Sequence, residues 1–223
     1  MAQKIKPNAY RLGVTIPWSS RWFLKKSNKF FVEEDHMIRE IINASILPAG
    51  IAAIDIERAG ENVRVNIKSA KPGLIIGRGG KGIEELKNKI QKALKKLRKK
   101  NTINQNFSLN INIEELKRFE ISAAVIAQQL AADLQKRLPY RRVMKRGLES
   151  IMQNRDVKGA KIKMGGRLDG AEISRSDFLL KGKMPLSSLR SNIDYGEATS
   201  HNSYGTVGIK VWIYKGEIFE ETK

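Results

Sequence analysis

The sequence contains no cysteine and only two histidines, His36 and His201, among its 223 residues. The missing cysteines exclude disulfides, cysteine nucleophiles and thiolate metal sites, and they fit a reducing compartment such as the cytoplasm. The two histidines lie too far apart in the chain to provide a metal-ligand spacing. We therefore expect no bound metal and no catalytic residue of these kinds.

Long apolar runs and acidic residues are both scarce. No stretch approaches the ~18 apolar residues of a membrane-spanning helix. Residues 1–7 lack the apolar core of a signal peptide and are too short and Pro-broken for a transit peptide. The 42 Lys and Arg residues outnumber the 23 Asp and Glu residues, which leaves a formal net charge of +19. A surface this basic needs a polyanionic partner, and without an apolar span nucleic acid is favoured over an anionic membrane.

The composition is that of a folded protein, since hydrophobic residues make up 41% of the chain and charged residues 29%. The length predicts two compact domains. No linker, low-complexity tract or repeat marks a boundary, so the division depends on the order of the predicted elements. We expect an N-terminal arm over residues 1–32, one domain over residues 33–113 and a second domain over residues 114–223.

The first 30 residues carry basic side chains and no acidic one, interleaved with Tyr10, Trp18, Trp22 and Phe23. Such an arm is typical of nucleic-acid contact. The aromatic side chains also fit a role in capping a neighbouring core, and the two roles are compatible. The arm residues that we predict to bind RNA are Lys4, Lys6, Arg11 and Arg21.

Residues 33–113 predict the order helix, strand, strand, helix, helix, strand. Apolar residues at helical spacing begin the domain, where Glu33, Glu34 and Asp35 suit the positive N-terminus of a helix. Alternating apolar residues then indicate half-buried strands. The expected elements are a helix over residues 33–47, strands over 51–57 and 62–69, a short segment over 74–76, a long amphipathic helix over 83–97 and a strand over 107–113.

Residues 114–223 predict two helices packed on a mostly antiparallel sheet, an α+β arrangement. Pro139 is well placed in the first turn of the second helix. Asp169-Gly170 is a strong signal for a hairpin. The expected elements are helices over residues 119–137 and 139–153, strands over 161–168 and 171–180, and a last strand over 207–213.

The turn Gly77-Arg78-Gly79-Gly80, followed by Lys81, is the most specific binding signature in the chain. Glycines at both ends allow main-chain amides to approach a phosphodiester closely, and the following helix N-terminus adds positive partial charge. A GXXG loop between these elements is how KH domains clamp the backbone of about four nucleotides. We therefore predict that residues 77–81 bind RNA.

Two rival phosphate motifs overlap the same turn. A P-loop is excluded, because it would need a glycine in place of Ile75 and a Ser or Thr in place of Gly82. The dinucleotide pattern G-x-G-x-x-G is satisfied by Gly77, Gly79 and Gly82, but the strand before it is short and no acidic residue follows between Glu85 and Glu114. A cofactor site remains the less favoured alternative.

Two basic clusters lie on predicted helices. The first is the acid-free run from Lys87 to Lys100, which fits either a phosphate-facing stripe or a solvated helix face. In the second, like charges stand four residues apart, which costs helix stability unless a polyanion lies opposite. The residues of this second cluster are Lys136, Arg137, Arg141, Arg142, Lys145 and Arg146, of which the last four are predicted to bind RNA.

These features together resemble the family of the third small-subunit ribosomal protein, nearly end to end. The matching stretches are Gln3 to Asn8 with Arg11-Leu12-Gly13, Ala70 to Gly73 running into the glycine turn, Gly166 to Ile173, Ile193-Asp194-Tyr195, and Gly208 to Glu217. Departures are Ala9, where many members have Gly, and a short tail after Glu217.

The resemblance implies a type II KH domain followed by a distinct C-terminal α+β domain. It implies a structural constituent of the small subunit's head that binds small-subunit rRNA and lines the channel through which mRNA enters, with no small-molecule substrate or cofactor. By motif position, Arg141, Arg142 and Lys145 map to residues that help to unwind mRNA. The implied protein neighbours are the tenth and fourteenth small-subunit proteins.

Two other classes remain open on the sequence. An independent KH regulator of messages would share the glycine turn but would not account for the C-terminal motifs. An enzyme would use the glycine turn for a cofactor, or would hydrolyse through Asp169, Glu172 and Asp177, which lie across the predicted hairpin.

Overall fold

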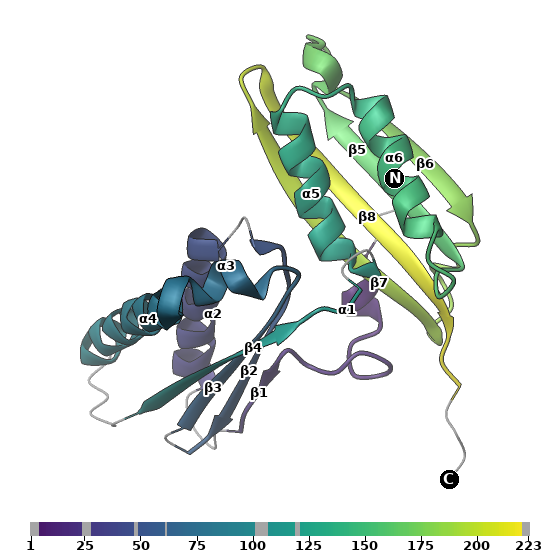
Figure 1. Cartoon of the computed structure of the whole chain (residues 1–223). Helices are drawn as coiled ribbons and strands as arrows, with labels where there is room; N and C mark the ends of the chain where they lie inside the picture. The colour runs from purple at the N-terminus through teal and green to yellow at the C-terminus, as the bar shows by residue number, and fades with distance from the viewer. Residues whose placement is uncertain are drawn as a thin grey trace. The chain divides into compact units, whose positions relative to one another are not determined.

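A computed structural model describes residues 5–23, 28–46, 49–60, 62–100, 107–118 and 121–219 (Figure 1). Lys4, one of the predicted RNA-binding residues, lies outside them. The chain forms two compact units: Trp18–Lys117 is the N-terminal unit, and Met1–Pro17 joins Arg118–Lys223 in the C-terminal unit. The expected arm over residues 1–32 is therefore divided between the two units.

The N-terminal unit is a four-stranded sheet in the order β1-β2-β3-β4 covered by helices. Strand β1 runs parallel to β2, β2 antiparallel to β3, and β3 parallel to β4. The parallel β3–β4 pair needs a crossover, which the helices α3 and α4 supply. The elements are β1 (Ser20–Arg21), α2 (Asn28–Ile46), β2 (Ile51–Ala59), β3 (Asn62–Ser69), α3 (Pro72–Ile76), α4 (Lys81–Lys100) and β4 (Ser108–Glu115).

The core of the N-terminal unit follows from two periodicities. Alternate residues of β3 point to the same face of the sheet, and residues of α2 and α4 three or four positions apart face it. The predicted order α-β-β-α-α-β is confirmed. The buried side chains of this core include Ile38, Ile42, Ile56, Val65, Ile67, Ile90 and Leu94.

The N-terminal unit also encloses a cluster of charges, formed by Glu34, Asp35, Arg58 and Arg98. Helix α2 begins at Asn28 and not at residue 33, so Glu34 and Asp35 lie inside the helix and are buried. The Glu34 carboxylate accepts hydrogen bonds from Arg58 at 2.5 Å and from Arg98 Nε at 2.7 Å. Asp35 accepts from Arg58 Nη2 at 2.5 Å and from Trp22 Nε1 at 2.8 Å.

Aromatic rings complete the surroundings of the two guanidinium groups. Arg58 lies over the Phe31 ring at 4.7 Å and Arg98 over the Phe107 ring at 4.4 Å. Burial alone would raise the pKa of the Glu34 carboxyl, but hydrogen bonds and charge from Arg98 and Arg58 outweigh it and hold that pKa below its ordinary value. Arg98 is thus a partner of Glu34, and not part of an RNA-facing stripe.

The C-terminal unit is an antiparallel four-stranded sheet in the order β6-β5-β8-β7, with α5 and α6 packed on one face (Figure 1). The expected two helices on a mostly antiparallel sheet are confirmed. The elements are α1 (Pro7–Tyr10), α5 (Ala123–Gln135), α6 (Tyr140–Met152), β5 (Gly159–Gly166), β6 (Arg175–Gly182), β7 (Ser191–Asn202) and β8 (Gly205–Glu217).

Close packing fixes the start of α5 on β7. A Cβ at Gly196 would lie 2.4 Å from backbone atoms of Ala123, so only glycine allows this approach. The Asp194 carboxylate accepts a hydrogen bond from the Ala123 amide at 3.1 Å, which satisfies one free donor at the helix N-terminus.

The expected tight turn at Asp169-Gly170 is wrong, although the pairing of the two flanking strands is confirmed. Strands β5 and β6 do pair, but residues 167–174 connect them through a 3₁₀ turn over Leu168–Gly170. The Leu168 side chain is buried in the core, and the Asp169 carboxylate accepts a hydrogen bond from the Tyr140 amide at 3.2 Å. These two tertiary contacts shape the connection more strongly than the local turn preference.

Arg11 anchors the N-terminal segment to the C-terminal unit and is fully buried. Its Nε donates to the Ser191 carbonyl at 2.7 Å, its Nη1 to the Pro7 carbonyl at 3.2 Å, and its Nη2 to the carbonyls of Leu186 and Ser188 at 3.0 and 2.7 Å. A guanidinium held in this way has no face turned to solvent. The burial of Arg11 argues against the prediction that it binds RNA.

None of the helices described is long and apolar enough to cross a membrane.

Replacing Glu34 with Gln removes the negative charge between two buried guanidinium groups. We expect the free energy of unfolding of the N-terminal unit to fall by about 3–5 kcal/mol. Because the folded pKa of Glu34 lies below the unfolded value of ~4.3, the wild type loses this contribution as the pH falls through the folded pKa, and the variant does not. Denaturant unfolding at several pH values, followed by Trp18 and Trp22 fluorescence in a Trp212→Phe background, measures both effects.

The matched control is Glu40→Gln on the same helix, because Glu40 is exposed and, among the described residues, forms an ion pair only with the exposed His36. This control should change the free energy of unfolding by less than about 1 kcal/mol. Equal effects of the two substitutions would contradict the role assigned to the buried cluster.

Replacing Arg11 with Lys keeps the positive charge but loses the planar array of donors. We expect the C-terminal unit to lose at least the ~1–3 kcal/mol that one unsatisfied buried group costs. Unfolding followed by Trp212 fluorescence in β8 measures this loss. RNA affinity at matched folded fraction should stay unchanged, and a weaker affinity with unchanged stability would restore Arg11 as an RNA contact.

Candidate nucleic-acid interface

The glycine turn lies between α3 and α4 in the N-terminal unit, where Gly77, Arg78 and Gly79 are exposed and Gly80 is half-buried. Gly77, Gly79 and Gly80 have φ values of 69°, 62° and 80°. Side chains other than glycine are strained in this region, so all three positions require glycine for the backbone alone. The turn thereby presents main-chain amides and the exposed Arg78 side chain at the start of α4.

Gly82 has a packing role that explains the rival dinucleotide pattern. A Cβ at Gly82 would lie 2.5 Å from the Ile75 carbonyl oxygen, and one at Gly77 would lie 3.1 Å from the Gly82 nitrogen. The two glycines therefore let α3 and α4 meet closely. The segment before the turn is also the helix α3 and not a strand, which removes the strand–turn–helix setting of a dinucleotide site.

Helix α4 carries exposed lysines along its outer face after the glycine turn. Its inward residues Leu86, Ile90, Leu94 and Leu97 are buried, which fixes the orientation of the helix. Arg98 belongs to the buried cluster, so the predicted stripe is shorter than the sequence run. The exposed members are Lys89, Lys92, Lys95, Lys96 and Lys99.

A groove of about 340 Å³ lies in the same unit, formed by β3, β4 and the first two turns of α4. Its side chains combine cations with amides and one apolar surface, which are the groups that hold a phosphate and read base edges. Asn112 is positioned by a hydrogen bond to Asn66 at 3.1 Å. The groove is lined by Arg64, Ile83, Lys87, Asn110, Ile111 and Asn112.

The second predicted site is at the start of α6 in the C-terminal unit. Arg141, Arg142, Lys145 and Arg146 are all exposed. The opposite face of the helix is buried in the core through residues at the complementary spacing. Those buried residues are Tyr140, Val143, Met144, Leu148 and Ile151.

The Tyr140 side chain positions Arg141. The Arg141 Nε donates to the Tyr140 hydroxyl at 3.0 Å, and the guanidinium lies 5.7 Å from the ring centroid. The hydrogen bond with the Tyr140 hydroxyl raises the pKa of Arg141. The Arg175 guanidinium on β6 lies 5.9 Å from the centroid of the same ring. No sequence motif indicates this cation, because only the pairing of β6 with β5 brings it there.

Two of the three carboxylates proposed for hydrolysis have structural partners. Asp169 caps α6, and Asp177 accepts hydrogen bonds from the Tyr140 hydroxyl at 3.4 Å and from the Phe178 amide at 2.8 Å. Glu172 is exposed. Among the described residues, no group of three or more His, Asp and Glu side chains is placed to hold a metal ion.

The remaining predicted arm residues are exposed and paired with carboxylates. Lys6 forms an ion pair with Glu197 in the C-terminal unit. In the N-terminal unit, the Nη1 of Arg21 on β1 lies 3.5 Å from the Oε1 of Glu57 on the paired strand β2. Both side chains are accessible to RNA, and their contacts with RNA remain predictions.

Two family descriptions match the chain. "KH domain" matches residues 37–121, and "Ribosomal protein S3, C-terminal domain" matches residues 130–213. The first contains the glycine turn and the groove beside it. The second contains α6 and most of the antiparallel sheet.

Curated relatives match over the full length of the chain. Small ribosomal subunit protein uS3 of Clostridium botulinum (strain Okra / Type B1) is 43% identical over 100% of this chain and 96% of its own length. The protein of the same name from Clostridium tetani is 41% identical with the same coverage. That from Solibacter usitatus is 39% identical over 100% of this chain and 61% of its own length.

Salt dependence tests whether Arg78 and Lys81 contact phosphates. With six to ten phosphate contacts, the affinity of the free protein for single-stranded RNA should fall roughly 300- to 16,000-fold between about 50 and 200 mM salt. Arg78→Ala and Lys81→Ala should each reduce the slope of log affinity against log salt by ~0.7.

Lys163→Ala is the control, because Lys163 is an exposed lysine on the sheet of the other unit. It should leave the slope of the wild type within error. A slope that neither Arg78→Ala nor Lys81→Ala changes would show that the glycine turn does not hold a phosphate in the free protein.

Proposed function

The chain belongs to the small ribosomal subunit protein uS3 family, and from this premise we propose that it binds rRNA in the head of the subunit and lines the channel through which mRNA enters. As a member of this family, the chain is a structural protein of the cytoplasmic small subunit and not an enzyme. Its KH domain makes RNA its ligand. The finer role concerns mRNA, which the start of α6 would contact and help to unwind.

The exposed basic start of α6 is the observation that carries this proposal. Four cations project from one short stretch of a helix whose other face is buried in the core. Like charges at i, i+4 disfavour an isolated helix, so the packing of Tyr140, Val143 and Met144 must hold them together. Phosphates bound opposite these side chains would reduce the repulsion, which favours RNA binding.

Arginine at these positions adds geometry to charge. A guanidinium binds phosphate oxygens with two parallel hydrogen bonds, which a lysine cannot do. Tyr140 already holds Arg141 through a hydrogen bond at 3.0 Å, so less side-chain freedom is lost on binding. Arg141 and Arg142 would therefore grip the backbone, with Lys145 as an additional point charge.

Strand separation by this surface needs no nucleotide hydrolysis. The base pairs at the end of an RNA duplex open and close spontaneously. Cations that bind the backbone of the opened strands more tightly than the closed duplex shift this equilibrium toward opening. The energy comes from phosphate contacts, and forward movement of the message comes from the ribosome itself.

The glycine turn and groove of the N-terminal unit would hold a backbone of rRNA. A GXXG turn clamps phosphates through main-chain amides, and the asparagines of the groove offer hydrogen bonds to bases. The resemblance to the family extends the proposal to two protein neighbours, the tenth and fourteenth small-subunit proteins. An independent regulator of messages is disfavoured, because such a protein would not need a C-terminal unit matched to uS3.

The triple substitution Arg141→Ala, Arg142→Ala and Lys145→Ala tests the role in unwinding. Reconstituted small subunits that carry it should pass through a stable mRNA hairpin roughly tenfold or more slowly, because losing even one charge-assisted contact worth about 1.5 kcal/mol changes a rate about tenfold. Translation of unstructured mRNA should keep its rate. A time-resolved translation assay on paired messages measures both.

The control triple is Lys163→Ala, Lys181→Ala and Lys210→Ala, three exposed lysines of the same unit. It removes the same charge but leaves the start of α6 intact. If both triples slow the hairpin message equally, general charge and not the α6 surface is responsible. If neither slows it, the proposal is wrong.

A further inference from the structure

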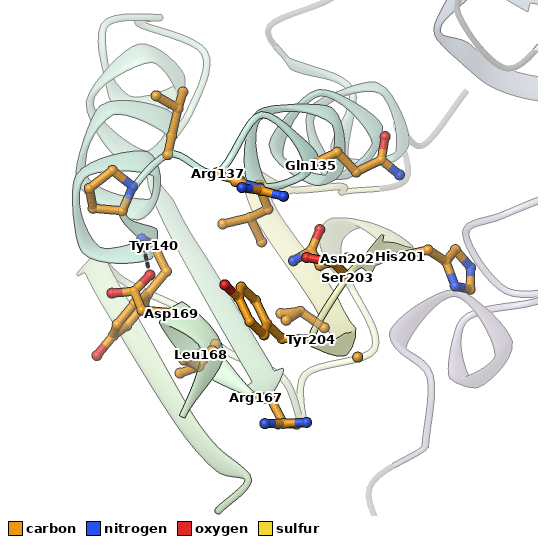
Figure 2. A pocket seen from close by; sticks show the side chains of 16 residues that line it. Gln135, Arg137, Tyr140, Arg167, Leu168, Asp169, His201, Asn202, Ser203 and Tyr204 are labelled. Atoms are coloured by element: carbon orange, nitrogen blue, oxygen red, sulfur yellow. Dashed lines mark hydrogen bonds between the residues drawn. The ribbon is translucent and has the colours of Figure 1, made fainter. Parts of the chain in front are cut away.

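A pocket of about 340 Å³ opens in the C-terminal unit beside the start of α6 (Figure 2). Three connections meet there: the α5–α6 connection, the 3₁₀ turn after β5 and the tip of the β7–β8 hairpin. Its volume falls at the low end of the ~300–1,000 Å³ range of ligand pockets. The pocket is large enough for one nucleotide and is open to solvent.

An exposed aromatic ring lies across this pocket. Tyr204 is at the tip of the β7–β8 hairpin, where Asn202 pairs with Gly205, and 58% of the residue is exposed. One side of the ring rests on Gly170, since a Cβ there would lie 3.3 Å from the ring. Figure 2 shows the ring in the middle of the lining residues. A tyrosine ring held in this way offers a platform on which a base can stack.

Arg137 lies across the pocket from Tyr204 (Figure 2). Its φ of 62° places it in the left-handed region, at the residue after the α5 C-cap where glycine is the usual choice. Its amide closes the helix by a hydrogen bond to the Leu134 carbonyl at 2.9 Å. An arginine in a conformation that favours glycine costs stability, and residues of this kind concentrate at functional sites. The exposed guanidinium provides the charge for a phosphate.

The remaining walls supply fixed polar groups. Arg167 is held by its Nε, which donates to the Ala171 carbonyl at 2.9 Å. Asn202 and Ser203 add an amide and a hydroxyl (Figure 2). The Asp169 carboxylate is engaged with the Tyr140 amide, so this acid is already neutralised in part by a helix N-terminus.

We infer that this pocket holds one unpaired nucleotide of an RNA strand, with the base stacked on Tyr204 and the adjoining phosphate bound by Arg137. Pro139 and Tyr140 line the pocket and lead directly into Arg141 and Arg142, so one strand can cross both surfaces. The inference rests on the proposed role of the α6 start as an RNA-binding surface. It adds a base-binding site to a surface that otherwise contacts phosphates only.

Two substitutions in the full-length protein test the pocket. Tyr204→Ala should lower the affinity for short single-stranded RNA roughly 5- to 100-fold, as expected for the loss of one base–aromatic stack. Arg137→Gly should also weaken binding while keeping or raising the unfolding temperature, because glycine fits the left-handed backbone. RNA containing 2-aminopurine reports stacking directly, and its quenching should disappear with Tyr204→Ala.

Phe178→Ala is the matched control, since Phe178 is an aromatic residue of the same unit, outside the pocket, and is 56% exposed. It should leave affinity and quenching unchanged. Tyr204→Leu covers the case in which Tyr204→Ala unfolds, because leucine keeps the apolar contact with Gly170 but cannot stack. Unchanged affinity and quenching in folded Tyr204→Leu and Arg137→Gly proteins would overturn the inference, as would an equal loss with Phe178→Ala.

The pocket and the α6 surface can fail separately. If the α6 triple slows the hairpin message while the Tyr204 and Arg137 variants bind RNA normally, the pocket inference fails and the proposed function stands. Crosslinking in assembled subunits identifies the strand, with 4-thiouridine placed either in mRNA or in rRNA. A crosslink to Tyr204 from either RNA supports the pocket and identifies its ligand. The absence of a crosslink from mRNA and from rRNA alike overturns the inference.

Discussion

The folds of both units depend on buried guanidinium groups whose donors are satisfied by carboxylates or backbone carbonyls. Arg58 and Arg98 share the Glu34 carboxylate inside the N-terminal unit, and Arg11 binds backbone carbonyls inside the C-terminal unit. A buried charge without partners costs several kcal/mol, so these side chains cannot turn outward without loss of the fold. The basic residues of this chain, with its net charge of +19, therefore include buried cations that hold the fold together as well as exposed cations that are accessible to RNA.

The cations left at the surface are presented by helices that the core holds in place. In α4 and α6, buried residues at helical spacing determine which basic side chains face solvent. The repulsion among neighbouring cations is tolerated because core packing, and not helix propensity, stabilises the helix. A phosphate backbone relieves this repulsion, so the same arrangement that costs the free protein stability favours RNA binding.

Backbone conformation distinguishes the two proposed binding regions, the glycine turn and the pocket beside α6. The glycine turn uses φ values that glycine adopts without strain, which lets main-chain amides approach a phosphate. Arg137 and Asp169 have positive φ without that freedom, and both line the pocket beside α6. Surrounding contacts keep these residues in the strained conformation, such as the hydrogen bond from the Tyr140 amide to the Asp169 carboxylate.

Periodicity and turn chemistry were enough to predict the α-β-β-α-α-β order, the two helices on an antiparallel sheet and the glycine turn, because each is encoded within a short segment. They gave no sign of the contacts between distant segments, such as the Asp169 carboxylate that caps α6 and the Ser191 carbonyl that lies 180 residues from its partner Arg11. The sequence shows how many cations the chain carries and at which positions they cluster. Which of them face RNA is decided only by the tertiary structure, because burial depends on carbonyls and carboxylates that folding brings from elsewhere in the chain.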